Sequence, residues 1–391
     1  MKKLLSIILC FILCFSLTAC TRIESDLTVP DTGDTTAPSP DTTEAATEPV
    51  PDSTVTLYMV GDVLLHERVT ESGLRDDGTY NFDHFFAHVG DDISSADLAL
   101  VNQEVILGGT SIGLSGYPAF NGPFEVGDAL ADAGFDVILH ATNHALDRGS
   151  TGLLNCIGFW KTEHPDISVV GIYESQAEQD TVLIREVKDM KIAVLNYTYG
   201  TNGIPLPDGM PYAVNLLDED KVISDLKYAE ENADFTVVCP HWGTEYTHTP
   251  DDNQKYWANI FTENGADLVI GTHPHVIEPL ETVNGVPVYW SLGNYINSTA
   301  QTGDGIADRM LGCAASVTLD RDSAGKVTVS DCGVIPLVCH VADGTDMTVY
   351  RLSDYTETLA SENLIVGSDP NFSLEYCKNL ASRIFGDIYP D

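Results

Sequence analysis

The sequence feature that most constrains the fold is a series of five β-rich runs, each followed closely by polar residues. The runs are VTLYMV (55–60), DLALV (97–101), FDVILH (135–140), FTVVC (235–239) and DLVIG (267–271). Segments with apolar residues three and four positions apart lie between or beside these runs and predict helices at 125–134, 218–233 and 252–265. Strands that alternate with helices are typical of an α/β layered fold.

Residues of the kinds that bind metal ions follow each of the five runs. In chain order they are Asp62 and His66, Asn102 and Glu104, Asn143, His144 and Asp147, His241 and Glu245, and His273 and His275. Ligands of α/β proteins bind beyond the carboxyl ends of the strands, so parallel strands would bring all five sets to one edge. Carboxylate, amide oxygen and imidazole are common ligands of divalent cations. The pattern therefore predicts a divalent-metal site.

Each set also has a structural interpretation when it is taken alone. A single histidine at a strand end is more often a hydrogen-bonding residue than a metal ligand. Asp62 is also compatible with a turn, and Asn143 with the N-cap of a helix. Five such sets after five β-rich runs favour the metal site over five unrelated structural roles.

The last set has a predicted local geometry. In an extended segment, residues two apart point to the same side, and Pro274 favours extended backbone at the preceding His273. We therefore expect an extended segment from which His273 and His275 both face the metal site.

The remaining patterns complete the expected fold. Asn284-Gly285 between two β-rich arms predicts a hairpin over 280–290, and further β-rich runs occur at 168–172, 191–197 and within 313–351. These runs predict an α/β, layered β-sheet core flanked by helices, in which the motif-bearing strands lie side by side. Residues 371–386 predict one amphipathic helix on the outside of the core.

Six motifs together resemble those of the CapA family of capsule-synthesis proteins. They are GDVLLH (61–66), NQE (102–104), TNHALDRG (142–149), HWGTEY (241–246), GTHPHVIEP (271–279) and SLGNY (291–295). Their order is also similar to that of the calcineurin-like metallophosphoesterases, to which the CapA family is related. The resemblance covers about residues 54–300. It implies a metallophosphoesterase-like domain over 54–352, followed by a helical extension over 353–391, and a role with poly-γ-glutamate.

The resemblance also implies roles for individual residues. Glu104 would bridge two metal ions, the first held by Asp62 and His275 and the second by Asn143, His241 and His273. His144 would protonate the leaving group, and Asp147 would orient the His144 side chain. The residues expected beside the ligands are His66, Asn102, Glu245 and Asn294. The sequence does not distinguish Mn, Zn, Fe and Mg.

Two positions differ from the phosphoesterase pattern. Leu64 stands where the first motif has a histidine, and Glu104 stands where an aspartate is usual. The loss of one nitrogen ligand predicts either a looser two-metal centre or a single ion, unless His66 takes the missing place. Phosphoesterase activity is therefore less strongly implied than the fold.

The first 53 residues predict export and anchoring. Residues 1–20 have a basic start and an apolar run, and they end in LTAC, which resembles a bacterial lipoprotein signal with Cys20 as the lipid acceptor. An ordinary cleaved signal is the alternative. Residues 21–53 are rich in Thr, Pro and acidic residues and predict a disordered tether. We expect the protein on the outer face of the cytoplasmic membrane.

The charge of the chain limits its partners. A net charge of −40 argues against nucleic acid, and it implies that a bound cation would attract any anionic substrate. Three functions remain open. They are a metal-dependent hydrolase or transferase of capsule or cell-wall polymer, a non-catalytic factor that binds an anionic polymer beside membrane-bound synthesis machinery, and a general extracellular phosphoesterase.

Some cysteine and aromatic residues have specific predictions. Cys313 and Cys332 would lie near each other in a hairpin, but sequence fixes hairpin register poorly, so a disulfide remains only an alternative to free thiols. Trp242 and Tyr246 flank a predicted ligand and are expected in the pocket wall. The aromatic residues on strands and helices are expected in the core.

Overall fold

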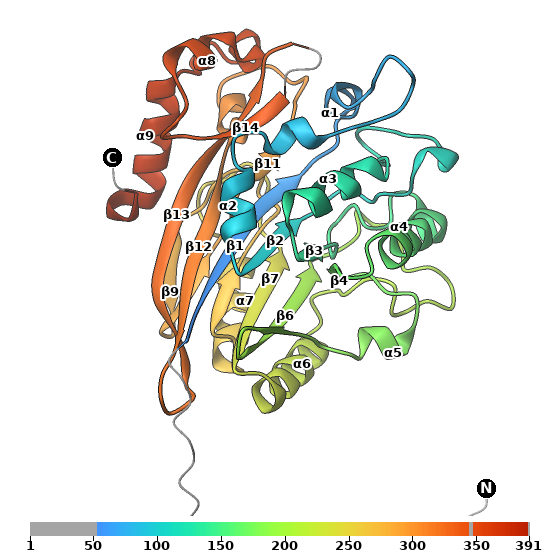
Figure 1. Ribbon diagram of the computed structural model, residues 1–391, viewed down its shortest axis with the longest axis vertical. Helices are drawn as coiled ribbons and strands as arrows, with labels where there is room; N and C mark the ends of the chain where they lie inside the picture. Colours follow the sequence, from blue (N-terminus) through green and yellow to red (C-terminus); the bar gives the residue numbers. More distant parts are fainter. Residues whose placement is uncertain (1–52, 344–346, 390–391) are drawn as a thin grey trace, which may run out of the picture. The chain divides into compact units, whose positions relative to one another are not determined.

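The computed structural model describes residues 53–343 and 347–389, whose strands form two sheets (Figure 1). The predicted signal peptide, the predicted tether up to residue 52 and Cys20 lie outside the described residues. Within the described ranges, no helix is both long enough and apolar enough to cross a membrane.

The first sheet has eight strands in the order β14-β13-β12-β1-β2-β3-β4, with β11 paired to β1 outside this path. Strands β1 to β4 and β11 run parallel to their neighbours in that group, and β12 to β14 add an antiparallel extension. Their bounds are β1 (Ser53–Val63), β2 (Leu98–Asn102), β3 (Val137–Leu139), β4 (Ser168–Val170), β11 (Asn294–Ile296), β12 (Leu311–Arg321), β13 (Val327–Val341) and β14 (Met347–Arg351).

The second sheet has six strands in the order β5-β6-β7-β8-β10-β9. Its four inner strands are parallel, and the two edge strands are antiparallel to their neighbours. The predicted hairpin is confirmed, with Asn284 and Gly285 both at positive φ, as a tight turn between twisted strands requires. The bounds are β5 (Leu183–Val187), β6 (Met190–Thr198), β7 (Phe235–His241), β8 (Leu268–Ile270), β9 (Leu280–Val283) and β10 (Val286–Tyr289).

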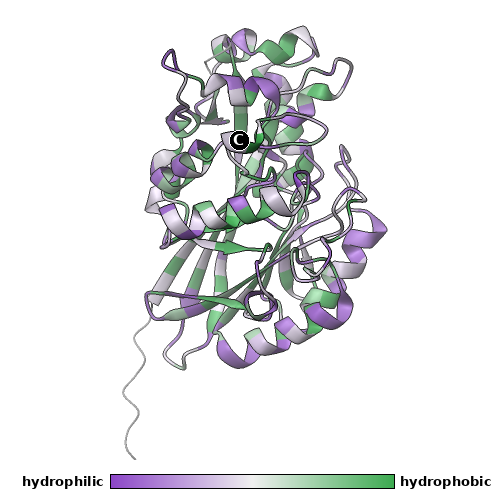
Figure 2. Ribbon diagram, turned by 90° about the vertical axis from the view of Figure 1, so that its right-hand side faces the viewer, coloured by the Kyte–Doolittle hydropathy of each residue, from purple (hydrophilic) through white to green (hydrophobic). Residues whose placement is uncertain are grey.

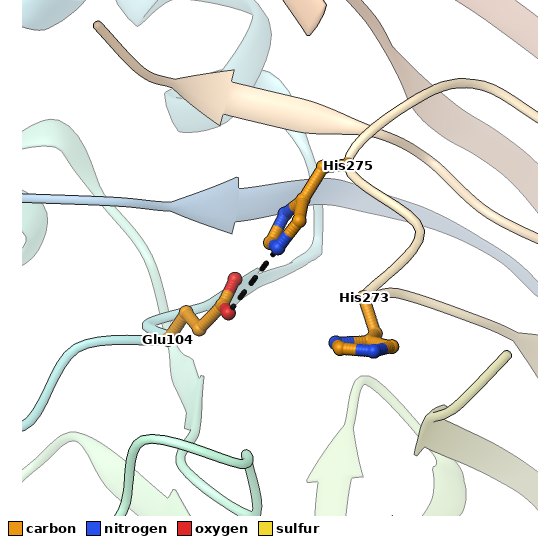
Figure 3. A group of neighbouring side chains, drawn as sticks. All are labelled: Glu104, His273 and His275. Atoms are coloured by element: carbon orange, nitrogen blue, oxygen red, sulfur yellow. Dashed lines mark ion pairs between the residues drawn. The ribbon is translucent and has the colours of Figure 1, made fainter. Parts of the chain in front are cut away.

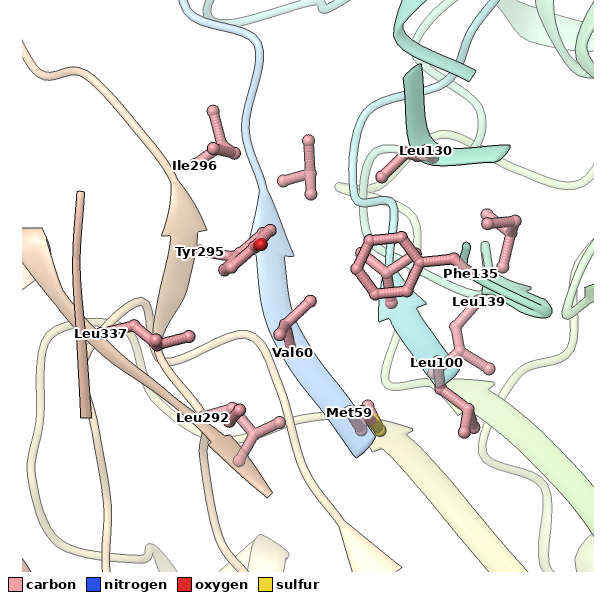
Figure 4. Packing of buried hydrophobic residues seen from close by; sticks show 14 of the residues in the cluster. Met59, Val60, Leu100, Leu130, Phe135, Leu139, Leu292, Tyr295, Ile296 and Leu337 are labelled. Atoms are coloured by element: carbon pink, nitrogen blue, oxygen red, sulfur yellow. The ribbon is translucent and has the colours of Figure 1, made fainter. Parts of the chain in front are cut away.

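Apolar side chains of both sheets belong to one buried cluster. The sulfur atoms of Met59 on β1 and Cys239 on β7 lie 3.8 Å apart, which places these two strands of different sheets in contact. Figure 4 shows part of this cluster around Val60, Leu100 and Tyr295. The burial of both sheets against each other fixes the strand ends that carry the predicted site.

Helices cover the sheets and carry hydrophobic and hydrophilic residues along their length (Figure 2). Residues of α6 and α7 form a second buried cluster with side chains of the second sheet. The α-helices are α1 (Glu67–Ser72), α2 (Gly90–Ser95), α3 (Glu125–Ala133), α4 (Gly149–Glu163), α5 (Gln176–Gln179), α6 (Glu219–Asn232), α7 (Asp252–Glu263), α8 (Glu357–Glu362) and α9 (Leu374–Phe385). Short 3₁₀ helices are η1 (Asp83–Phe86), η2 (Thr110–Ile112), η3 (Ile306–Met310), η4 (Leu364–Gly367) and η5 (Gly386–Ile388). The predicted α/β layered core flanked by helices is confirmed.

Two details concern the C-terminal part. The predicted amphipathic helix is α9, which Ser373 caps and which buries Cys377, Leu380 and Phe385. The predicted hairpin of β12 and β13 is also present, but Cys313 pairs with Pro336 across it, and both predicted partners are free thiols. The register therefore separates Cys313 from Cys332, and no disulfide forms between them.

Candidate metal centre

The predicted site residues converge from two sheets rather than from neighbouring strands of one sheet. The first three polar sets lie at or just after the carboxyl ends of β1, β2 and β3 of the first sheet, whereas the last two lie at or just after those of β7 and β8 of the second. The expectation that all motif-bearing strands lie side by side was therefore wrong. The residues still meet, because the two sheets pack face to face and bring their strand ends together.

Glu104 lies at the centre of the group. Its Oε1 is 3.7 Å from Nε2 of His275, 3.8 Å from Nε2 of His241 and 4.0 Å from Nε2 of His144. Glu104, His273 and His275 each offer a possible ligand atom within 4.8 Å of the others. Figure 3 shows His275 pointing toward Glu104 from the loop that also carries His273. This central position is the one that a bridging carboxylate requires.

Asp62 and His275 form one side of the centre. Asp62 Oδ2 and His275 Nδ1 lie 3.2 Å apart. Asn102 donates to Asp62 Oδ1 over 2.8 Å, and Asn294 Oδ1 lies 3.1 Å from His275 Nδ1. Strand pairing places Asn294 directly opposite Asp62. Two of the residues predicted beside the ligands therefore hold Asp62 and His275 in place.

Asn143 and His241 form the other side. Asn143 Oδ1 and His241 Nε2 lie 2.9 Å apart, and the other ring nitrogen of His241 lies 3.0 Å from Thr272 Oγ1. The His273 ring lies 4.8 Å from the His241 ring, measured between centroids. His273 therefore lies near His241, and His275 lies beside Asp62; the assignment of the two histidines to different metal ions stays a prediction.

The backbone of the His273-Pro274-His275 segment differs from the prediction. His273 has φ = 102° and His275 has φ = 61°, so neither residue is extended. Left-handed backbone is costly for residues with a Cβ atom, and such strain tends to persist where a functional arrangement requires it. Both imidazoles reach the centre, but a tight turn places them there instead of the alternation of a strand.

His144 and Asp147 form a hydrogen-bonded pair at the edge of the centre. His144 Nδ1 donates to Asp147 Oδ2 over 2.6 Å, because a carboxylate can only accept. The same oxygen accepts from the backbone N–H of Phe120 over 2.8 Å. The pair leaves Nε2 of His144 facing the centre, which is the orientation that proton donation to a leaving group needs.

A cavity of about 400 Å³ adjoins the centre. Leu64, His66, His144, Glu245 and His275 contribute to its wall. His66 packs its ring against Phe120 and makes no hydrogen bond or ion pair with a predicted ligand in the described part of the chain. The prediction that His66 takes the missing ligand place therefore gains no support from the structure.

Burial controls the protonation of the centre. It raises the pKa of Glu104 well above its ordinary value, with Asp62 adding to the rise and His275 opposing it. Burial and the neighbouring imidazoles lower the pKa of His241 and of His273 well below the usual value. For His275, burial would lower the pKa, but the carboxylates of Glu104 and Asp62 outweigh it and raise the pKa to about 9.

These residues fit a divalent cation. Both carboxylate oxygens of Glu104 and Nδ1 of His273 are buried and have no hydrogen-bond partner among the described residues. Buried groups of this kind are costly unless something satisfies them, and a cation would do so. Asn143 Oδ1 and His241 Nε2 lie 2.9 Å apart, and Asp62 Oδ2 and His275 Nδ1 lie 3.2 Å apart. Two atoms at such a spacing can both bind one ion at about 2.1 Å.

Some site residues have no signal in the sequence. Thr272 contacts His241 and lies within the GTHPHVIEP motif, but threonine is not a residue type that indicates a metal ligand. Asn202 lies 59 positions from Asn143 in the chain yet contacts it and His144, over 3.3 and 3.4 Å. Trp242, expected in the pocket wall, is instead a core residue whose indole N–H donates to the Trp290 carbonyl. Tyr246 does line the cavity.

Two solved structures show a weak likeness to this chain. The first is a putative 5′-nucleotidase from Staphylococcus aureus, with 16% identity and a TM-score of 0.45, covering 73% of this chain and 54% of that chain. The second is the NAD nucleotidase of Haemophilus influenzae, with 11% identity and a TM-score of 0.45, covering 87% and 65%. Both TM-scores lie below 0.5, so this likeness says nothing about the activity of the chain.

Two curated relatives are more informative. The PGA biosynthesis protein CapA of Bacillus subtilis is 34% identical over 43% of this chain and 44% of its own length. The capsule biosynthesis protein CapA of Bacillus anthracis is 28% identical over 62% of this chain and 59% of its own length. The chain thus spans about half the length of these relatives.

The family comparison covers most of the domain that carries the metal centre. The family model described as bacterial capsule synthesis protein PGA_cap matches residues 56–299, which is more than half of the chain. All the predicted metal ligands fall inside this range. The chain therefore belongs to the PGA_cap family of bacterial capsule synthesis proteins.

Proposed function

We propose that the protein is a metal-dependent hydrolase or transferase of the cell surface that acts in the biosynthesis of poly-γ-glutamate capsule or of a cell-wall polymer. The observation that carries this proposal is the buried Glu104 carboxylate, which lies among His144, His241 and His275 and has no hydrogen-bond partner in the described part of the chain. The family and the names of the two curated relatives support the polymer as the object of the reaction.

The residues of the site support this chemistry. A bound divalent cation would supply Lewis-acid activation of water and of the scissile group. Asp62, Glu104, Asn143, His241, His273 and His275 would hold one or two such ions. His144, oriented by Asp147, faces the centre with Nε2 and is placed to give a proton to a leaving group. Burial of the whole group excludes water from all but the cavity side.

Metal analysis of the purified full-length protein, beside hydrolysis assays, tests the proposal. We expect at least one tightly bound divalent ion and a metal-dependent rate on γ-glutamyl oligomers or peptidoglycan fragments. A rate on aryl phosphates alone would make the protein a general phosphoesterase. Protein that binds no divalent metal would refute the proposal.

A second function is favoured by one observation. The buried side chain of Leu64 occupies the first-motif position of the expected histidine, so the centre has one nitrogen ligand fewer. A centre with this weaker ligand set would bind metal without catalysing a reaction. The protein would then be a non-catalytic factor that binds an anionic polymer and assists its assembly or export, beside membrane-bound synthesis machinery. Stoichiometric metal with no metal-dependent rate on any of the three substrates would favour this function.

We also propose that Cys20 is lipidated and anchors the protein to the outer face of the cytoplasmic membrane. The support is the LTAC sequence at the end of the predicted signal peptide. The Cys20→Ser variant is expected to lose membrane association or to accumulate as an uncleaved precursor, as measured by fractionation and immunoblotting. Unchanged processing and membrane association would remove the lipoprotein interpretation.

A further inference from the structure

The cavity beside the metal centre has one arginine and no lysine among its described lining residues. Arg309 is the only Arg or Lys among the described residues that line the cavity, although the cavity also receives His144 and His275 from the metal centre. Arg309 belongs to η3, outside the range matched by the family model. Its position matters in a chain with 59 acidic and only 19 basic residues, because an acidic protein needs a local cation to admit an anion.

The guanidinium group of Arg309 is held in one orientation. Its Cζ lies 3.5 Å from the centroid of the Tyr246 ring, which is cation–π contact, and Nη1 donates to Gln301 Oε1 over 2.8 Å. The Nε atom is buried and has no hydrogen-bond partner among the described residues. A guanidinium group that stacks through its face donates its N–H groups in its own plane, so those not bonded to Gln301 are left for an acceptor there.

The segment that carries Arg309 is tied to the metal centre and to the C-terminal helix. The Asn294 side chain donates to the Arg309 carbonyl over 3.1 Å, and the same side chain contacts His275. The neighbouring Asp308 carboxylate accepts from Tyr376 of α9 and lies 2.9 Å from Nε2 of His248. Asp308 is therefore already engaged by other groups, and the position of Arg309 is fixed relative to His275.

We propose that Arg309 is an anion-binding subsite that receives an oxyanion of the substrate, a carboxylate or a phosphate, while the bond to be cleaved lies at the metal end of the cavity. This inference rests on the proposed function and names the substrate chemistry of that site. A planar guanidinium binds such an oxyanion through two parallel N–H···O bonds. Glu245 also lines the cavity, but its side chain is solvent-exposed, so water and salt weaken its repulsion of the bound anion.

Calorimetric binding to the full-length protein tests the subsite. The ligands are tri-γ-glutamate, the same oligomer with its carboxylates amidated, and inorganic phosphate, each measured with the protein metal-loaded and metal-free. We expect wild-type protein to bind an anionic ligand and to reject the amidated oligomer. The Arg309→Gln variant should bind about 10- to 100-fold more weakly with unchanged metal content, because a charge-assisted pair is lost. Arg309→Lys should recover only part of the affinity.

A matched control and the opposing outcomes complete the design. Lys227→Gln on α6 makes the same change in net charge away from the cavity and should bind as the wild type does. Equal affinity of Arg309→Gln and wild type, or no binding of either anion by metal-loaded wild type, overturns the subsite and leaves the metal-dependent function standing. If the protein takes up no divalent metal and still shows Arg309-dependent binding, the metal-dependent function is overturned and the subsite stands. Binding of phosphate but not of tri-γ-glutamate assigns the oxyanion to a phosphate group.

Discussion

Replacing Glu104 by Gln is expected to remove divalent metal from the protein while leaving it folded. Glu104 Oε1 lies within 4.0 Å of the nitrogen atoms of three imidazoles, which include His275 on one side of the centre and His241 on the other. An amide has the same shape but supplies no negative charge to neutralise a cation. Loss of residues beside a metal ligand usually lowers affinity 10- to 100-fold, so loss of a bridging ligand should lower it by at least about 100-fold. Metal analysis after dialysis measures the change.

The same substitution should make the metal-free protein more stable. Burial raises the pKa of Glu104, so the folded chain keeps this proton to a higher pH than the unfolded chain does. Above the ordinary pKa of 4.5 the folded state therefore binds more protons, and the free energy of unfolding falls as pH rises. A glutamine in place of this glutamate has no proton to lose. We expect metal-free Glu104→Gln to exceed metal-free wild type by about 1–3 kcal/mol near neutral pH, with a flatter pH profile.

Glu278→Gln is the control for burial without metal binding. Glu278 is buried, burial raises its pKa to about 8, and Gln254 donates to it over 2.6 Å. In the Glu278→Gln variant the free energy of unfolding should also fall less between pH 4.5 and about 8 than in the wild type, but the variant should keep its metal. Chemical denaturation at several pH values measures both variants. If Glu104→Gln keeps wild-type metal content, Glu104 is a structural carboxyl and not a ligand.

The position of the site could be predicted from the sequence because it depends on local patterns. β-rich runs and the polar residues after them are contiguous, so Asp62, Glu104 and His241 could each be assigned to a strand end from neighbouring residues alone. The Asn284-Gly285 turn was predictable for the same reason, since two positive φ angles in a row select these residue types.

Other parts depend on contacts between distant segments, which local patterns do not encode. The division of the strands into two sheets follows from burial of β1 against β7, and the sequence does not show which strands pair. The free Cys313 and Cys332 follow from a hairpin register that the sequence did not determine, in which Cys313 pairs with Pro336. Arg309 enters the cavity from a segment 34 positions after His275, with no motif to mark it.

The left-handed backbone at His273 and His275 shows a further limit. Pro274 favours extended backbone before it, and a statistical preference of this kind is worth only about 1 kcal/mol. The packing of the loop overrides it, since the backbone N–H of His273 lies 3.3 Å from Asp62 Oδ2 and the Pro274 carbonyl accepts from Tyr246 N–H. These contacts fix the turn, and only the three-dimensional structure supplies them.

The two histidines are expected to serve different halves of the centre. His275→Ala should lower metal content on the Asp62 side, because these residues lie 3.2 Å apart, whereas His273→Ala should lower it on the side of Asn143 and His241. Double variants separate the two cases. His275→Ala with Asp62→Asn should lose little more metal than either change alone, whereas His275→Ala with His273→Ala should lose the sum of both. If neither single variant loses metal, the imidazoles are structural and the hydrolase proposal fails with them.

Glycine variants distinguish the ligand from the backbone at these two positions. Alanine keeps the strain of positive φ, and glycine relieves it, so His273→Gly and His275→Gly should each be about 1 kcal/mol more stable than the alanine variant in the metal-free state. Both kinds of variant lack the imidazole and should lose metal equally. Denaturation of metal-free protein beside metal analysis makes the comparison. The glycine and alanine variants at one position both lack the imidazole and share every other group in the centre. A glycine variant that keeps its metal would therefore show that the backbone turn, rather than the imidazole, is what metal binding requires.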